Sequence, residues 1–127
     1  MTKTLISTDK APAAIGPYSQ AVEAGGWVYL SGQISLDPAS GELVGDNVSD
    51  QTKQVLKNME AVLEAAGLQF SHVVKTNVYL KSMDDFPTVN EIYGGVFSEN
   101  PPARACIQAA KLPKDVLVEI DAVAFKG

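Results

Sequence analysis

The chain contains a single arginine among its ten basic residues, and this residue, Arg104, lies in the short segment Pro102-Ala-Arg-Ala-Cys106. A guanidinium group matches a carboxylate with two parallel hydrogen bonds, a geometry that the ammonium group of lysine cannot reproduce. Arg104 is therefore a candidate anchor for a small carboxylate ligand. The residue types leave a second interpretation equally open, in which Arg104 pairs with Glu119 or Asp121 on an adjoining strand.

Three other residues could take part in acid–base or nucleophilic chemistry. Glu119, within a predicted strand, could be a general base with a raised pKa or only the partner of Arg104. Cys106 would be a nucleophile only beside an activating base, and the one histidine, His72, opens a predicted strand with no nucleophile near it in the sequence. We therefore interpret Cys106 as a small buried residue and His72 as a surface residue. One cysteine and one histidine also exclude the usual Cys/His zinc site, so we predict no metal.

Two further segments could shape a ligand pocket, although each could equally be a structural turn. In residues 11–20, two prolines and Gly16 precede Tyr18. Prolines restrict the backbone and glycine permits a tight bend, so this segment would hold Tyr18 in a fixed place. Ser31 and Gly32 end a predicted strand, where the glycine would expose backbone N–H groups to a ligand.

The composition excludes several classes of protein. A chain of 127 residues that is 46% hydrophobic fits one globular domain, 1–127. The net charge of −5 and the lack of a basic stripe argue against nucleic acid as a partner. No apolar run approaches the ~18 residues that span a membrane, and the first ten residues do not resemble a signal peptide. A single cysteine cannot form an internal disulfide, so we expect a reducing, cytoplasmic location.

The order of predicted elements is β-β-α-β-α-β-β, which contains two β-α-β units with right-handed crossovers. A turn at Gly25-Gly26 separates the first two strands, and Gly67 closes the first helix after an N-cap at Ser49. Pro87 is tolerable in the first turn of the second helix. The predicted strands are 19–24, 27–33, 72–80, 103–109 and 116–125. The first helix is predicted to follow Ser49 and run to Ala66, and the second to start at Asp84 or Asp85 and run to about Ser98. One apolar stripe is predicted on the first helix: Val55, Met59, Val62, Leu63 and Ala66.

Side-chain alternation divides the last two strands between the two faces of the sheet. In 116–125, one face is wholly apolar: Val116, Val118, Ile120, Ala122 and Ala124. The opposite face is mixed: Leu117, Glu119, Asp121, Val123 and Phe125. In 103–109, one face holds Ala103, Ala105 and Ile107, and the other holds Arg104, Cys106 and Gln108.

Both purely apolar faces are expected under the two helices, which would place Arg104 and Glu119 together on the second face. Two helices cannot cover both faces of such a sheet, and a half-apolar uncovered face is a contact surface. We therefore predict oligomerisation through that face, with Arg104 and Glu119 at or near a subunit boundary.

The sequence resembles the RidA/YjgF family of enamine/imine deaminases. The similar segments follow the order of the family and cover nearly the whole chain. They are Ala11-Pro-Ala-Ala-Ile-Gly-Pro-Tyr-Ser-Gln20, Ser31-Gly-Gln33, Val74-Lys-Thr76, Val89-Asn90, Pro102-Ala-Arg-Ala-Cys106 and Leu112-Pro-Lys-Asp-Val-Leu-Val-Glu-Ile120. Ala105, Gln108 and the short loop 98–101 depart from the family at the expected rim of the pocket.

The resemblance implies a chorismate-mutase-like α+β fold with two helices on one face of the sheet, assembled as a homotrimer with three sites between subunits. It also implies hydrolysis of 2-iminobutanoate and 2-iminopropanoate to 2-oxo acids and ammonia, without a cofactor. Arg104 would bind the substrate carboxylate, the N–H of Cys106 would meet the imine or keto end, and Glu119 would direct water. The pocket would be completed by Tyr18, Ser31, Gly32 and Asn90.

Two other functions within the same family remain alternatives. A ligand-sensing or partner-binding regulator would use the same pocket without turnover. An RNA-cleaving or translation-inhibiting protein would need basic surface, and the acidic balance argues against it.

Overall fold

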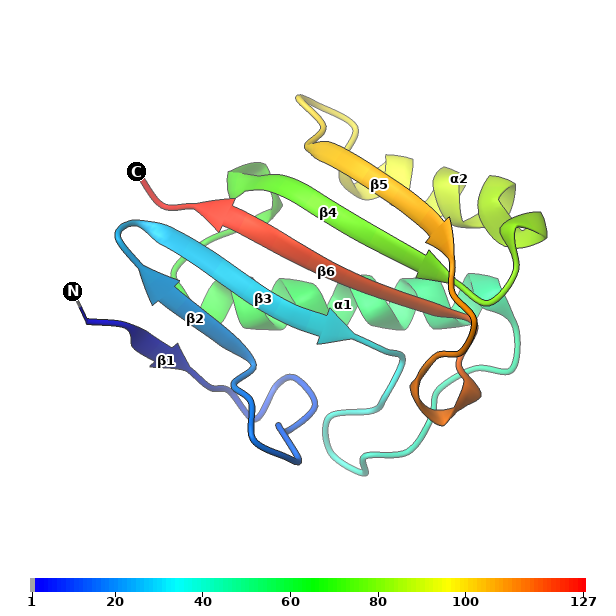
Figure 1. Ribbon diagram of the computed structural model, residues 1–127, viewed down its shortest axis with the longest axis horizontal. Helices are drawn as coiled ribbons and strands as arrows, with labels where there is room; N and C mark the ends of the chain where they lie inside the picture. The colour runs from blue at the N-terminus through cyan, green and yellow to red at the C-terminus, as the bar shows by residue number, and fades with distance from the viewer. Residues whose placement is uncertain (1) are drawn as a thin grey trace.

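The computed structural model describes residues 2–127 and consists of a six-stranded mixed sheet with two helices on one of its faces (Figure 1). The strand order is β1-β2-β3-β6-β4-β5. The strands are β1 (Thr4–Ile6), β2 (Ala21–Ala24), β3 (Trp27–Gln33), β4 (Val73–Leu80), β5 (Ala103–Gln108) and β6 (Val118–Phe125), and the helices are α1 (Val48–Ala65) and α2 (Phe86–Val96). The predicted α+β architecture with both helices on one face is confirmed.

The last strand in the sequence lies inside the sheet. β6 pairs antiparallel with β3 on one side and β4 on the other, so β3 and β4 run in the same direction. β5 pairs parallel with β4 at the sheet edge. The two predicted β-α-β units are therefore present as β3-α1-β4 and β4-α2-β5. This topology places Glu119 on an inner strand and Arg104 on an edge strand.

Three details differ from the sequence prediction. The short edge strand β1 was not predicted, because three residues carry too little alternation to be recognised. β6 begins at Val118 and not at residue 116. Side-chain alternation extends N-terminally to residue 116, but pairing with β4 stops at Val118. The N-cap of α1 is Asn47, whose side chain accepts a hydrogen bond from the N–H of Asp50 at 2.9 Å, and not Ser49. Gly67 follows the C-cap with a φ of +77°, as predicted.

The hydrophobic core lies between the sheet and α1. The predicted stripe on α1 is confirmed, since Val55, Met59 and Val62 are fully buried. They pack in one cluster with Val118 and Ile120 of β6. Burying one such side chain stabilises the fold by about 1.5–3 kcal/mol.

The second helix is held by one stripe of side chains. Phe86, Asn90, Tyr93 and Phe97 recur at helical spacing and lie on the side that faces β4 and β5. Gly94 and Gly95 lie inside α2 although each glycine costs roughly 1 kcal/mol against alanine. A Cβ added at either glycine would meet nothing within 4 Å, so both lie on the uncovered side of the helix.

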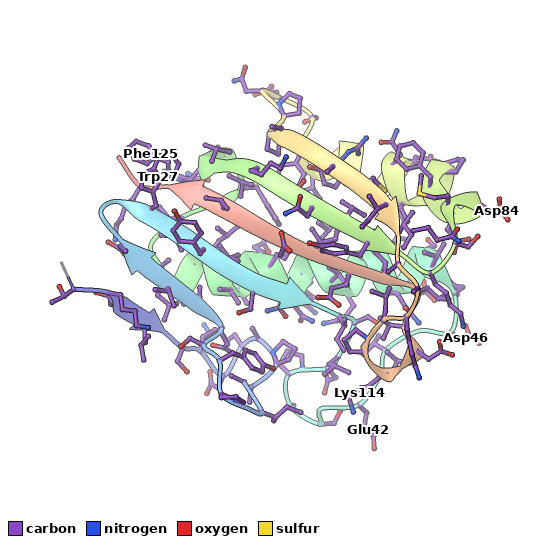
Figure 2. All side chains as sticks on the ribbon, viewed as in Figure 1. Trp27, Glu42, Asp46, Asp84, Lys114 and Phe125 are labelled. Carbon is purple, nitrogen blue, oxygen red and sulfur yellow. The ribbon has the colours of Figure 1, made fainter. Side chains whose placement is uncertain are left out.

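Within residues 2–127, no element covers the face of the sheet opposite the helices, and several apolar side chains are exposed on it. Trp27 and Phe125 pack with ring centroids 4.5 Å apart, and Tyr29 beside them is 51% exposed (Figure 2). Val123 pairs in register with Tyr29. The prediction of a half-apolar uncovered face is therefore confirmed, and we call this face the open face.

The faces of β5 are reversed from the prediction. Arg104 and Cys106 pair in register with Thr76 and Val78, which are buried under the helices, so both side chains lie on the helix side. Ile107 lies on the open face and is 53% exposed. Alternation shows which residues share a face but not which face the helices cover. On this edge strand Arg104 lies on the helix side, because the rings of Phe86 and Tyr93 on α2 accommodate its guanidinium.

Candidate functional site

Arg104 and Glu119 do not meet within the chain. β4 separates β5 from β6, and the two side chains lie on opposite faces of the sheet. Asp121 is also unavailable to Arg104, because it accepts hydrogen bonds from Asn77 and Tyr79 on the open face. The second interpretation, in which Arg104 pairs with either carboxylate, is therefore wrong within a single chain. The site residues form two separate clusters.

The first cluster, the arginine cluster, consists of Arg104 with Phe86, Asn90 and Tyr93 of α2. Nη1 of Arg104 donates a hydrogen bond to Oδ1 of Asn90 at 2.8 Å. The guanidinium carbon lies 4.9 Å from the ring centroid of Tyr93 and 5.3 Å from that of Phe86. Such contacts of a cation with ring faces are attractive and orient the guanidinium plane. Asn90, predicted as a pocket residue, thus contacts the arginine directly.

The edge strand also offers backbone donors beside Arg104. The N–H of Ala109 donates to the carbonyl of Leu80 on β4 at 2.9 Å. Because successive residues of a strand direct their N–H groups to opposite sides, the N–H of Cys106 points away from β4. No other strand of residues 2–127 pairs on that side. A ligand held by Arg104 could therefore reach this N–H group.

The thiol of Cys106 is not prepared for nucleophilic attack. Burial raises its pKa, and the positive charge of Arg104 opposes this only in part. A thiol with a raised pKa is a weak nucleophile at neutral pH. His72 likewise has a local role, since its Nδ1 accepts a hydrogen bond from the N–H of Gln69 at 3.1 Å.

The second cluster, the glutamate cluster, lines a cavity of about 500 Å³ next to the open face. It contains four of the predicted site residues: Tyr18, Ser31, Gly32 and Glu119. Lys114 contributes to the rim, at the opposite end of β6 from Trp27 and Phe125 (Figure 2). The remaining wall is largely apolar and includes Pro12, Ala13, Ile15, Leu36 and Pro113.

Gly32 is needed at its position because the side chain of Glu119 lies over it. A Cβ added at Gly32 would lie 3.0 Å from the carboxyl carbon of Glu119 and would overlap one carboxylate oxygen. Glycine is therefore required at position 32 because the side chain of Glu119 occupies the space, and not because the backbone adopts an unusual conformation.

The surroundings of Glu119 favour its protonated form. Burial raises the pKa of this carboxyl, and the negative charge of Asp121 raises it further. Asn77 and Tyr79 each hold an oxygen of Asp121 at 2.9 Å. The hydrogen bond to Asp121 in turn raises the pKa of Tyr79, which stays a donor. A half-buried carboxyl with a raised pKa is a candidate for proton transfer.

Gln20, which was not predicted as a site residue, holds the segment that carries Tyr18. Its buried side chain accepts a hydrogen bond from the N–H of Thr8 at 2.6 Å and donates one to the carbonyl of Pro12 at 2.7 Å. The hydroxyl of Ser31 donates to the carbonyl of Ser19 at 2.6 Å. The only feature of the sequence that points to this role is the position of the glutamine between a proline-rich segment and a strand. This position does not show which groups its side chain would hydrogen-bond.

Gln108, one of the departures from the family pattern, has a structural role. Its side-chain oxygen accepts a hydrogen bond from the N–H of Met83 at 2.9 Å, before the start of α2.

Within residues 2–127, no group of three or more His, Cys, Asp and Glu side chains could hold a metal ion. In the same residues, no helix is long and apolar enough to cross a membrane.

Comparison with known proteins gives close matches over nearly the whole chain. The family described as Endoribonuclease L-PSP matches residues 8–126. A RutC family protein of Pyrococcus horikoshii is 51% identical, over 98% of each chain. The 2-iminobutanoate/2-iminopropanoate deaminase of Homo sapiens is 54% identical, over 100% of this chain and 93% of that protein. The crystal structure of E. coli TdcF with bound serine superposes with a TM-score of 0.93 at 42% identity, covering 98% of this chain and 99% of that one.

Proposed function

Because the chain belongs to the Endoribonuclease L-PSP (RidA/YjgF) family, we propose that it is an enzyme that hydrolyses 2-imino acids to 2-oxo acids and ammonia. 2-Iminobutanoate and 2-iminopropanoate are the proposed substrates, since a relative 54% identical is named as the deaminase of these two compounds. The observation that carries the proposal is the arginine cluster. Its guanidinium is oriented by Asn90 and two rings beside a free backbone N–H, which suits a carboxylate next to a polar double bond.

The name of the family raises ribonuclease activity as an alternative. RNA binding draws most of its affinity from basic side chains that replace counterions at the phosphates. This chain carries a net charge of −5, and the cavity of the glutamate cluster has a largely apolar wall with Lys114 as its one basic residue. The balance of charge therefore favours a small carboxylate substrate over RNA.

The separation of the two clusters supports a site that is shared between subunits. A substrate as small as 2-iminobutanoate cannot touch Arg104 and Glu119 of one chain, because they lie on opposite faces of the sheet. Both could reach it if the β5 edge of one copy lay against the open face of the next. A head-to-tail contact of this kind forms a ring when the rotation between copies closes, and we propose a ring of three, a homotrimer.

The proposed reaction needs water and a proton carrier. Arg104 binds the carboxylate, and the N–H of Cys106 meets the imine end, so that the reacting carbon is held in place. Glu119 of the adjoining subunit removes a proton from water as the oxygen attacks that carbon. It then returns the proton to nitrogen, which gives a carbinolamine. In the second step Glu119 takes the proton of the new hydroxyl group and passes it to nitrogen, so that the C=O bond forms as the C–N bond breaks and ammonia leaves. Tyr18, Ser31, Gly32 and Asn90 complete the pocket.

The function is tested by adding the protein to a threonine dehydratase and following release of 2-oxobutanoate. We expect the protein to accelerate the step from imine to 2-oxo acid in proportion to its concentration. Binding of 2-oxobutanoate without any acceleration would instead identify a ligand-sensing regulator. Failure both to bind and to accelerate would contradict the proposed function.

We predict that the protein is a trimer in solution. Light scattering at micromolar concentration should give three times the 13.5 kDa mass of the chain, because the open face would otherwise leave Trp27, Tyr29 and Phe125 in water. A monomer mass under these conditions would contradict both the trimer and the shared site.

Gly32→Ala should lower turnover strongly while the protein stays folded. The added methyl group occupies the space of the Glu119 carboxylate, which is the flexible end of a side chain and can move away. We expect kcat to fall roughly 10²-fold, as for a catalytic group displaced by about 1 Å. Gly94→Ala is the matched control, since its Cβ meets nothing within 4 Å. The control should keep full activity, and equal activity in both variants would show that Glu119 need not occupy this position.

A further inference from the structure

Behind the arginine cluster lies a buried hydrogen bond that links α2 to β4. The hydroxyl groups of Tyr93 and Thr76 lie 2.7 Å apart. Thr76 is fully buried, and Tyr93 is only 4% exposed. The ring of Tyr93 also packs on Phe97, with centroids 4.6 Å apart, and Phe97 packs edge-on against Phe70. The ring therefore has one fixed orientation.

The same ring forms the support on which the guanidinium rests. Arg104 lies directly beside Thr76 in the β4–β5 register, and its guanidinium carbon is 4.9 Å from the centroid of Tyr93. Asn90 occupies one N–H of Nη1. Because a guanidinium group has five N–H donors, enough remain on its other edge for a bidentate carboxylate.

We infer that Tyr93, locked by its hydrogen bond to Thr76, is a positioning residue that holds Arg104 in the orientation that receives the substrate carboxylate. Arginine has many rotamers in solution, and an unsupported side chain on an edge strand would lose this freedom on binding each ligand. The ring of Tyr93 and the amide of Asn90 restrict the Arg104 side chain to one conformation before the ligand binds. Burial raises the pKa of the Tyr93 hydroxyl, so it stays protonated beside the guanidinium.

Mobility of the arginine tests this inference without any ligand. Arg104 is the only arginine, so labelling arginine with a nitrogen isotope yields a single Nε–H signal in NMR spectra. In the wild type we expect an order parameter close to that of the rigid backbone. In Tyr93→Phe and in Thr76→Val it should fall clearly, because the ring loses its anchor. An unchanged order parameter in both variants would overturn the inference.

Kinetics test the consequence for substrate, and this part rests on the proposed function. Tyr93→Phe should raise KM for the imine roughly 5- to 10-fold with little change in kcat, as for loss of one hydrogen bond that preorganises binding. Val89→Ala is the control, because Val89 is buried in the same helix and is not part of the arginine cluster. It should lower the melting temperature and leave KM unchanged.

The double variant Thr76→Val/Tyr93→Phe separates positioning from stability. Replacing both hydrogen-bonding partners with apolar groups leaves no buried polar group unpaired, so the melting temperature should return close to that of the wild type. KM and the mobility of Arg104 should stay altered. Recovery of all three together would show that the pair serves stability alone. If the wild type neither binds nor hydrolyses the imine, the proposed function fails, and the NMR result still decides whether Tyr93 positions Arg104.

Discussion

Arg104→Lys should lose binding of small 2-oxo acids almost as completely as Arg104→Ala. Lysine keeps the positive charge but has neither the planar fork nor the flat surface that rests on Phe86 and Tyr93. A charge-assisted hydrogen bond contributes about 1.5–3 kcal/mol, so affinity should fall roughly 10- to 150-fold. Calorimetric titration with 2-oxobutanoate measures this loss. Thermal protection by the same ligand should disappear in parallel.

The trimer should survive both substitutions, because the proposed role of Arg104 is to bind ligand. Lys57→Ala is the matched control, since it removes one positive charge from the exposed side of α1. It should bind 2-oxobutanoate as the wild type does. If Arg104→Ala still binds the ligand and hydrolyses the imine, Arg104 is not the anchor. If that variant dissociates into monomers, Arg104 holds subunits together instead.

Glu119→Gln should keep the shape of the pocket and lose turnover by roughly 10²–10⁴-fold, the usual contribution of a general acid–base group. The wild-type rate should also fall on acidification, because only the ionised carboxylate can take a proton from water. Burial and Asp121 raise the pKa of Glu119 above its ordinary value of 4.5, so this acid limb of kcat/KM should lie above that value. Near-normal hydrolysis by Glu119→Gln would reduce Glu119 to a structural residue.

Mixing the variants Arg104→Ala and Glu119→Gln, both expected to be inactive, gives a direct test of the shared site. Trimers refolded from equal amounts of Arg104→Ala and Glu119→Gln contain some boundaries where both contributing residues are intact. In a ring with one arginine and one glutamate from different chains at each site, about a quarter of the sites should be restored. A site formed within one chain would recover no activity on mixing.

Except for β1, the sequence by itself determined the main strands and helices and their order. The apolar stripe of α1 and the alternation of β6 predicted which side chains form the core, because helical and strand periodicities place them on one face. The same patterns predicted an uncovered, half-apolar face. Arg104 and Glu119 were recognisable from residue type alone, since each belongs to a small class of groups that can bind a carboxylate or move a proton.

Tertiary structure decided how these two residues lie relative to one another. Alternation along β5 grouped Arg104 with Cys106 but could not show that this pair faces α2. Pairing with β4, and not with β6, then placed Arg104 and Glu119 on opposite faces of the sheet. This separation excludes an ion pair within the chain and supports the proposal that the two residues contribute to one site from different subunits.

Contacts between residues distant in sequence could not be predicted from the sequence either. The hydrogen bonds of Gln20 with Thr8 and of Tyr93 with Thr76 join segments that are 12 and 17 residues apart. Local periodicity predicts that such side chains are buried or polar, but it does not predict their partners. The partners depend on which strands become neighbours and how their registers align, and these are properties of the assembled sheet. For this reason the residues that hold the site in place became visible only in the folded chain.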